Sequence, residues 1–188
     1  MNKYHTYLLA AVAVLLCLAT NAQGLNEKER AFIGAHNIQL VDSTVLFRDL
    51  MKDNGKVKMV VIFTNYCPGT PLMFENIKKF NEQYGDRIEY ILCSSAGSHE
   101  LRTLAKVPEA NGYTGRVYFI DPEHYREYRD DERKKGLLFR NAICGPCRNE
   151  VIGTPYYLFF DTHSNILFHG YSTRNDFNAL LGEYFKQQ

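Results

Sequence analysis

The sequence of 188 residues contains no tryptophan, only six prolines and almost no net charge. Its 22 lysine and arginine side chains nearly balance 21 aspartates and glutamates, which leaves a formal charge of +1 at pH 7. A chain this close to neutral has no broad positive field for phosphates or anionic lipids, which argues against nucleic acid as a partner. Repeats and low-complexity segments are missing too, and 45% of the residues are hydrophobic. This composition excludes a disordered or fibrous protein and indicates a globular one.

A long apolar run is also missing, and the run near the N-terminus is short. Leu8 to Ala19 is apolar over twelve residues, which as a helix spans only about 18 Å of a bilayer core about 30 Å thick. Lys3 precedes this run, and Thr20-Asn21-Ala22 follows it with residues suited to cleavage. The pattern predicts a signal peptide over residues 1–22 and one domain over residues 23–188. We therefore expect an exported protein, periplasmic or secreted, with no membrane attachment after signal cleavage.

Strand and helix patterns alternate along the predicted domain. The run Met59 to Phe63 is apolar at every position, which is typical of a central strand covered by helices on both faces. Helical spacing of apolar residues indicates a helix over residues 68–84, and Gly85 stands where such a helix ends. We expect strands at residues 38–41, 56–64, 88–93, 117–120, 156–160 and 166–169, and further helices at 43–52, after Ser98, after Asp121-Pro122 and after Thr173. The alternation predicts a three-layer α/β sandwich.

Few side chains are candidates for metal binding, because no two histidines have the close spacing of metal ligands. We therefore expect no metal site. Four cysteines remain after signal cleavage, in a compartment where disulfides persist. A domain of this length buries a core unaided, so chemical roles for the cysteines compete with structural ones. These cysteines are Cys67, Cys93, Cys144 and Cys147.

Two segments resemble the thioredoxin fold superfamily. The strand that ends in Thr64-Asn65-Tyr66-Cys67-Pro68, followed by a helix, resembles the active-site entry of these proteins, and Gly153-Thr154-Pro155 before residues 156–161 resembles their cis-proline loop. The extra helix and strand between these segments are similar to the secreted TlpA-type and peroxiredoxin-like branch. The resemblance implies a central mixed sheet with helices on both faces, with an added helix and strand before the cis-proline loop.

The cysteine positions differ from the usual thioredoxin pattern. Thr70 stands where the family has its second active-site cysteine, and a Cys-Gly-Pro-Cys motif occurs at Cys144 and Cys147 instead, shortly before Pro155. A thiolate at a helix N-terminus is stabilised by free amide groups and the helix dipole, so Cys67 is the candidate nucleophile. Our main hypothesis is that Cys67 forms a mixed disulfide that Cys144 or Cys147 resolves.

The resemblance also implies the rest of a thiol–disulfide oxidoreductase site. Thr154 and Pro155 are expected to pair with an extended substrate, with Tyr66 and Thr70 as further contacts. The expected partners are thiols and disulfides of exported proteins and an electron donor that the sequence does not identify. No cofactor is required.

Other interpretations of the same residues remain open. The Cys144/Cys147 pair, or a bond from Cys67 to one of its members, is a structural disulfide in the second interpretation, and the protein is then a redox-inactive binding module. A third is a peroxiredoxin-like peroxidase, because Thr64 and Cys67 have the Thr-x-x-Cys spacing of that family. We expect Cys93 to pack as a small hydrophobic residue, and the mixed charges at residues 126–135 to form a solvated helix face.

Overall fold

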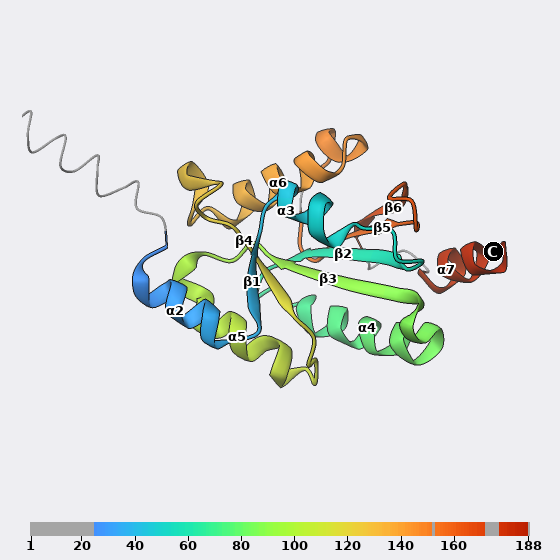
Figure 1. Ribbon diagram of the computed structural model, residues 1–188, viewed down its shortest axis with the longest axis horizontal. Helices are drawn as coiled ribbons and strands as arrows, with labels where there is room; N and C mark the ends of the chain where they lie inside the picture. Colours follow the sequence, from blue (N-terminus) through green and yellow to red (C-terminus); the bar gives the residue numbers. More distant parts are fainter. Residues whose placement is uncertain (1–24, 152, 172–176, 188) are drawn as a thin grey trace, which may run out of the picture.

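The computed structural model describes residues 25–151, 153–171 and 177–187 (Figure 1). Its centre is one sheet of six strands in the order β1-β4-β3-β2-β5-β6. Four strands run parallel, β5 is antiparallel to β2, and β6 is antiparallel to β5. The strands are β1 (Ile38–Val41), β2 (Val57–Phe63), β3 (Ile88–Ser94), β4 (Val117–Ile120), β5 (Tyr156–Phe160) and β6 (Ile166–Tyr171). The predicted mixed sheet is confirmed.

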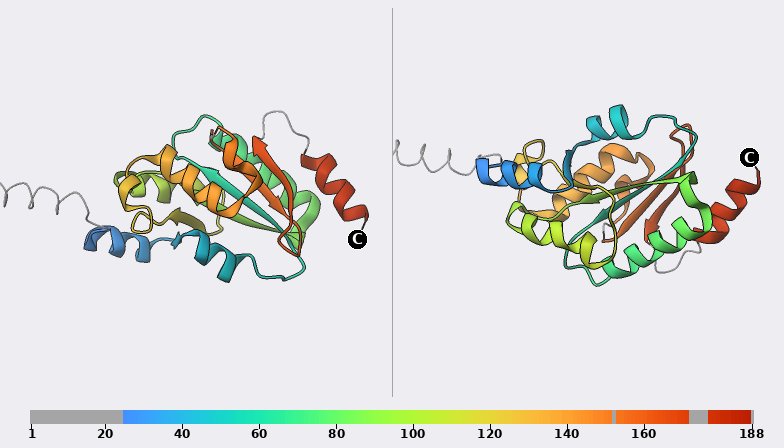
Figure 2. Two further views of the ribbon diagram at one scale, coloured as in Figure 1. Left: turned by 90° about the horizontal axis from the view of Figure 1, so that it is seen from above. Right: turned by 60° about the horizontal axis from the view of Figure 1, so that its bottom comes forward.

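Helices cover both faces of this sheet, as Figure 2 shows for α6 on one face and α4 with α5 on the other. Because successive side chains of a strand point to opposite faces, β2 contributes to two separate cores. Met59, Val61 and Phe63 pack towards α4, whereas Val60 and Ile62 pack towards α6. The helices are α2 (Glu27–Ala35), α3 (Ser43–Val45), α4 (Thr70–Tyr84), α5 (Leu101–Ala110), α6 (Glu132–Ile143) and α7 (Phe177–Lys186).

The central position of β2 explains why its sequence lacks alternation. All seven of its residues are buried, and each fully buried large apolar side chain contributes roughly 1.5–3 kcal/mol. Its register with β5 places Ile62 opposite Tyr156. That pairing brings the loop before β5 next to the loop after β2, where the sequence predicts the functional residues.

The N-terminal helix α2 was not predicted from the sequence. Asn26 accepts a hydrogen bond from the amide of Glu29, 2.9 Å away, and the Glu29 carboxylate accepts one from the amide of Asn26 at 2.7 Å. This capping box has the sequence signature Asn-x-x-Glu, which could have revealed the helix.

Two predicted helices differ in detail from the observed ones. The segment 43–52 begins with the short α3 and continues as a π-helical turn, η1 (Leu46–Leu50), in which the amide of Met51 donates to the carbonyl of Leu46 at 2.9 Å. Ser98 does not cap α5 directly, because η3 (Ser98–Glu100) precedes that helix and Glu100 occupies its N-cap position.

The sequence predicts one solvated helix face over residues 126–135, and this is wrong for the helix start and for Lys135. Residues Arg126–Tyr128 form the 3-10 turn η4, and α6 begins only at Glu132. Lys135 on its first turn is completely buried. The start of the helix predicted after Thr173 lies outside the described residues, as does the predicted signal peptide.

Candidate functional site

Cys67 lies in the short loop between β2 and α4. The amide of Cys67 donates to the carbonyl of Thr64, and the amide of Thr70 donates to the carbonyl of Cys67 at 2.9 Å. These bonds wind the chain from the strand end into the helix, with Gly69 at the N-cap of α4. Cys67 is a free, partly exposed cysteine, so its sulfur is available for chemistry with another molecule.

The loop before β5 forms the other side of this site. The Thr154–Pro155 peptide bond is cis, which confirms the cis-proline loop implied by the resemblance. The Cys67 thiol donates to the carbonyl oxygen of Thr154, with Sγ and O 2.7 Å apart. The hydroxyls of Thr64 and Thr154 lie 3.3 Å apart. The candidate nucleophile and the predicted substrate-pairing loop are therefore in direct contact.

Gly69 is the residue that permits this close approach. A Cβ atom at this position would lie 2.7 Å from Cδ of Pro155 and 3.7 Å from Sγ of Cys67. The first distance is too short for any side chain, and a proline ring has little freedom to move away. A glycine is therefore required where the two loops meet.

Thr70, the residue in the place of the second active-site cysteine, has an internal role. Its side chain is 1% exposed, and its hydroxyl donates to the carbonyl of Thr64 at 2.8 Å. This bond ties the first turn of α4 to the end of β2. The substrate contact predicted for Thr70 does not fit the structure, because a side chain buried in this way has no surface to offer.

Tyr66 is the most accessible of the predicted substrate contacts, with 64% of its surface exposed. Its hydroxyl donates to the carboxylate of Glu132 at the start of α6. That carboxylate and the burial of the ring raise the pKa of Tyr66. The ring borders a cavity of about 790 Å³ that is lined by Thr64, Tyr66, Ser95, Asp130, Asp131, Glu132, Arg133, Gly153 and Thr154. Cys67 is not part of this lining, but Tyr66 directly before it and its hydrogen-bond partner Thr154 are.

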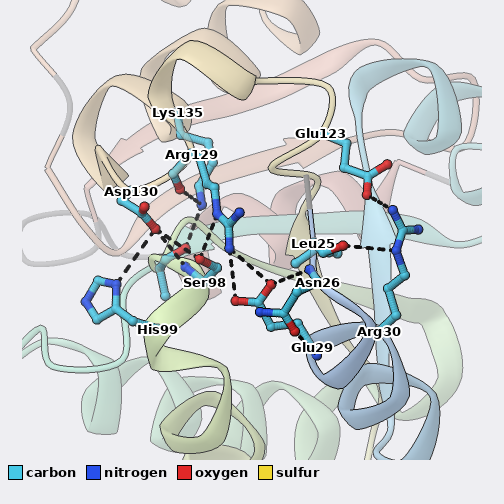
Figure 3. A network of polar contacts seen from close by, with 11 residues as sticks. Leu25, Asn26, Glu29, Arg30, Ser98, His99, Glu123, Arg129, Asp130 and Lys135 are labelled. Carbon is cyan, nitrogen blue, oxygen red and sulfur yellow. Dashed lines mark hydrogen bonds and ion pairs between the residues drawn. The ribbon is translucent and has the colours of Figure 1, made fainter. Parts of the chain in front are cut away.

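A network of polar contacts holds the segment before α6 that forms one wall of this cavity (Figure 3). Arg129 lies between two elements, pairing with Glu29 of α2 at 2.9 Å and donating to the hydroxyl of Ser98 at 3.0 Å. The carboxylate of Asp130 accepts from the same hydroxyl at 3.0 Å and from the Ser98 amide at 3.3 Å. The wall therefore depends on residues that are far apart in sequence.

Lys135 anchors the same wall from inside the protein. Its ammonium group donates to the carbonyls of Ala96 at 2.6 Å and Arg129 at 3.0 Å, and it lies 4.8 Å from the ring centre of Phe119. Burial lowers the pKa of Lys135 from 10.5 to about 8, although Asp130 and other nearby carboxylates oppose this shift. No sequence pattern indicates this burial, since lysine and its charged neighbours are typical of an exposed helix.

Cys144 and Cys147 are bonded to each other, with their Cα atoms 5.4 Å apart. Both are completely buried in the core on the α6 side of the sheet, in the cluster that also contains Ile62 and Tyr156. The bond closes the turn between the end of α6 and η5 (Pro146–Asn149). Cys67 is not part of this bond, so the hypothesis that the pair resolves a mixed disulfide stays a prediction.

The segment after this disulfide is fixed by a buried arginine. Arg140 has no exposed surface, and its guanidinium donates to the backbone carbonyl of Glu150 at 2.9 Å. The Glu150 carboxylate in turn accepts from the hydroxyl of Tyr156 at 2.5 Å and lies 3.0 Å from Nδ1 of His169. These contacts connect the segment that follows the disulfide to β5 and β6.

Cys93 is completely buried near the end of β3, in the same core as the disulfide. Burial raises the pKa of its thiol, which disfavours the reactive thiolate. The prediction that Cys93 packs as a small hydrophobic residue is confirmed.

One group of side chains in the described part of the chain has ligand atoms close enough for a metal ion. It consists of His99, Glu100 and Glu132, whose nitrogen and oxygen atoms lie within 4.8 Å of one another. Glu132 comes from a different element than the other two, which explains why histidine spacing gave no signal. The grouping overlaps the hydrogen bonds that Glu132 already makes to Tyr66 and to the amide of Gly97. Among the described helices, none is both long and apolar enough to cross a membrane.

Comparison with solved structures finds related folds at low sequence identity. A thiol:disulfide interchange protein of the thioredoxin family from Chlorobium tepidum has a TM-score of 0.51 and 16% identity, covering 69% of this chain and 79% of that one. A thiol-disulfide oxidoreductase from Bacteroides fragilis has a TM-score of 0.49 and 10% identity over 75% and 88% of the two chains. A secreted disulfide oxidoreductase from Mycobacterium tuberculosis has values of 0.46 and 10%, over 72% and 84%. No protein-family model and no curated protein matches the sequence.

Proposed function

We propose that this chain, which has a thioredoxin-like fold, is an exported thiol–disulfide oxidoreductase that reacts through Cys67. The observation that carries the proposal is the contact between the free Cys67 thiol and the carbonyl of Thr154 in the cis-proline loop, 2.7 Å apart. A substrate strand that pairs with this loop brings its own disulfide to the same sulfur. Export is part of the proposal and rests on the predicted signal peptide over residues 1–22.

The reaction begins with the Cys67 thiolate attacking one sulfur of a substrate disulfide. A new bond joins Cys67 to that sulfur, and the other substrate sulfur leaves as a thiolate and takes up a proton. A second thiolate must then displace the substrate from Cys67. Thr70 cannot do this because it carries a hydroxyl, so the thiolate comes from the Cys144/Cys147 pair in its reduced form or from an external thiol.

Release by the pair requires two events. The Cys144–Cys147 bond must first accept two electrons from an external dithiol donor, and the segment that carries it must then expose a sulfur that is buried in the closed form. Attack by either thiolate on the mixed disulfide forms a bond to Cys67 and frees the substrate as a thiol. The Cys-Gly-Pro-Cys sequence supports this route, whereas the complete burial of both sulfurs supports a structural bond.

The second candidate function is a binding module without redox activity. Two observations favour it, namely the buried Cys144–Cys147 bond and the hydrogen-bonded Thr70 in place of a resolving cysteine. In this case the open side of the cis-proline loop contacts a partner without covalent chemistry. The accessibility of Cys67 favours the enzyme instead.

A redox titration with disulfide mapping tests the proposal. The purified protein is equilibrated in glutathione or dithiothreitol buffers, the thiols are blocked, and the bonds are located by peptide mass spectrometry. We expect Cys67 to form a trapped mixed disulfide with glutathione and the Cys67→Ser variant to form none. A Cys144–Cys147 bond that opens above about −300 mV supports catalysis by the pair, since structural bonds have lower potentials.

The double variant Cys144→Ala/Cys147→Ala separates the roles of the three sulfurs. If the pair resolves the mixed disulfide, this variant still forms the adduct at Cys67 but releases it more slowly. If the pair is structural, release is unchanged and stability falls by about 2 kcal/mol, the loop-entropy value for so short a loop. A folded protein whose Cys67 remains inert to disulfide reagents contradicts the enzymatic proposal and favours the binding module.

A further inference from the structure

The cavity beside Cys67 has walls of different chemical character. Its lining includes the residues that flank the sulfur, Tyr66 and Thr154, and on another side three consecutive acids from Asp130 to Glu132. Among the described residues that line it, Arg133 is the one with a basic side chain. Because the whole chain is almost neutral, this acidity is local to the site rather than a property of the protein surface. A partner bound at Cys67 therefore meets concentrated negative charge.

Hydrogen bonds to backbone amides hold the acidic wall in place. The carboxylate of Glu132 accepts from the amide of Gly97 at 3.2 Å, and Asp131 caps α6 by accepting from the amide of Lys134 at 2.9 Å. Asp130 accepts from the amide of Ser98 (Figure 3). The positions of these charges are thus built into the fold, and a ligand does not have to order them.

Basic groups near the wall offset part of this charge, but acidic residues outnumber basic ones in the cavity lining. Arg129 pairs with Glu29 and donates to the Ser98 hydroxyl that Asp130 also contacts. The buried ammonium of Lys135 donates to two backbone carbonyls and is also attracted by Asp130 and Glu132. Lys134 lies 3.8 Å from Asp131 and is an exposed partner of it. Burial raises the pKa of the neighbouring Glu100, and the charge of Glu132 adds to this rise.

An aromatic ring adds a second feature that suits a cation. Tyr66 is largely exposed, borders the cavity, and is oriented by its hydrogen bond to Glu132. A ring face beside carboxylates is a favourable environment for a guanidinium or ammonium group. The cavity is open to the surface, and its volume of about 790 Å³ is large enough to receive such a group. The negative charge, the exposed ring and the available volume therefore all favour a guanidinium or ammonium group.

We propose that the preferred substrates of Cys67 are extended polypeptides with a lysine or arginine next to their disulfide-bonded cysteine. The basic side chain enters the cavity, stacks on Tyr66 and pairs with Asp131 and Glu132, while the substrate backbone pairs along Thr154. This inference rests on the proposed thiol–disulfide exchange and adds a substrate class to it. The reaction is unchanged: the bond between Cys67 and the substrate sulfur forms as the other substrate sulfur leaves as a thiolate.

Two synthetic peptides test this inference directly. They share one sequence, carry a single cysteine activated as a 2-pyridyl disulfide, and differ only in having arginine or glutamate beside that cysteine. Attack by Cys67 releases thiopyridone, whose absorbance gives the second-order rate constant. We expect the arginine peptide to react at least about tenfold faster at low salt, and the ratio to shrink in about 1 M salt because screening weakens exposed charge pairs.

Charge-neutralising variants show whether the acidic wall causes the preference. Asp131→Asn/Glu132→Gln keeps side chains that accept the capping bonds, so the fold is retained while two charges are lost. We expect its peptide ratio to fall close to one. Glu75→Gln removes an exposed charge on α4 that pairs with Lys79 and should leave the ratio unchanged. A neutral pyridyl disulfide reports any general change in Cys67 reactivity.

The possible results separate the inference from the function on which it rests. Equal rates for the two peptides in the unmodified protein overturn the substrate preference but leave the oxidoreductase intact. A preference that persists in Asp131→Asn/Glu132→Gln also overturns the inference, because the acidic wall is then not its cause. Failure of Cys67 to react with either peptide, in a folded protein whose denatured form does react, contradicts the proposed function itself.

Discussion

Replacing Lys135 by methionine should change how the stability of the protein depends on pH. The side chain is completely buried, and its ammonium donates to the carbonyls of Ala96 and Arg129. Methionine has a similar length and no titratable group. It leaves the two carbonyls without their donor, which costs stability by an amount that is the same at every pH. Any pH dependence of the difference in the free energy of unfolding between the two proteins therefore comes from the titration of Lys135.

The expected size follows from the pKa of Lys135, which burial lowers from 10.5 to about 8. Between these values the unfolded chain binds the proton and the folded chain does not, so the free energy of unfolding rises with pH. The cost of the buried charge is fully present below about pH 8 and is relieved as the pH approaches 10.5. A pKa lowered this far corresponds to about 3 kcal/mol in total, of which about 2 kcal/mol should appear between about pH 7 and pH 10.

Urea denaturation at several pH values measures this effect. Cys67 is alkylated beforehand so that thiol exchange does not interfere, and the free energy of unfolding of the Lys135→Met protein is subtracted from that of the unmodified protein at each pH. As the pH rises, the free energy of unfolding of the unmodified protein should increase relative to that of Lys135→Met. Lys134→Met removes an exposed lysine from the same helix and should give a much flatter difference. A flat or falling difference for Lys135 would refute the argument that its charge is buried at a cost.

Two further predictions concern the Cys67 loop. Thr70→Cys should form a disulfide with Cys67. The Thr70 amide donates to the Cys67 carbonyl, so the two residues are the first and last of a β-turn, whose Cα atoms lie under about 7 Å apart and within reach of a disulfide. It should reduce insulin faster than the unmodified protein in a turbidity assay, and no gain would show that the loop geometry is unsuitable. Gly69→Ala should lower stability by about 1–3 kcal/mol and slow the reaction of Cys67, because its Cβ would lie 2.7 Å from Pro155. Gly34→Ala, where nothing lies within 4 Å, is the control in thermal unfolding and should be neutral or stabilising; equal losses in both variants would contradict the packing argument.

Much of the fold could be predicted because it depends on short-range patterns. The unbroken apolar run at residues 59–63 identified the central strand, and helical spacing with Gly85 at the end identified α4. The segment Gly153-Thr154-Pro155 located the cis-proline loop by resemblance. The exception is α2, whose capping signal at Asn26 and Glu29 lies close to the end of the predicted signal peptide.

The candidate site was predictable only in part. Cys67 and the cis-proline loop follow from motifs, since Cys67 comes shortly after one predicted strand and the loop comes directly before another. The cavity wall does not, because Asp130 and Glu132 look like any charged helix start until the network with Ser98 and Gly97 is known. Those partners lie more than thirty residues earlier in the chain.

The sequence by itself therefore determined the α/β elements, the candidate nucleophile Cys67 and the threonine at position 70 where the resembled family has a cysteine. Tertiary structure decided which side chains meet: it paired Cys144 with Cys147 inside the core, buried Lys135, and brought the acidic wall beside Tyr66. The physical reason is that helix and strand preferences act between near neighbours, whereas burial and charge pairing depend on strand order and helix packing. Whether a lysine in a charged segment is exposed or buried depends on which elements pack against that segment.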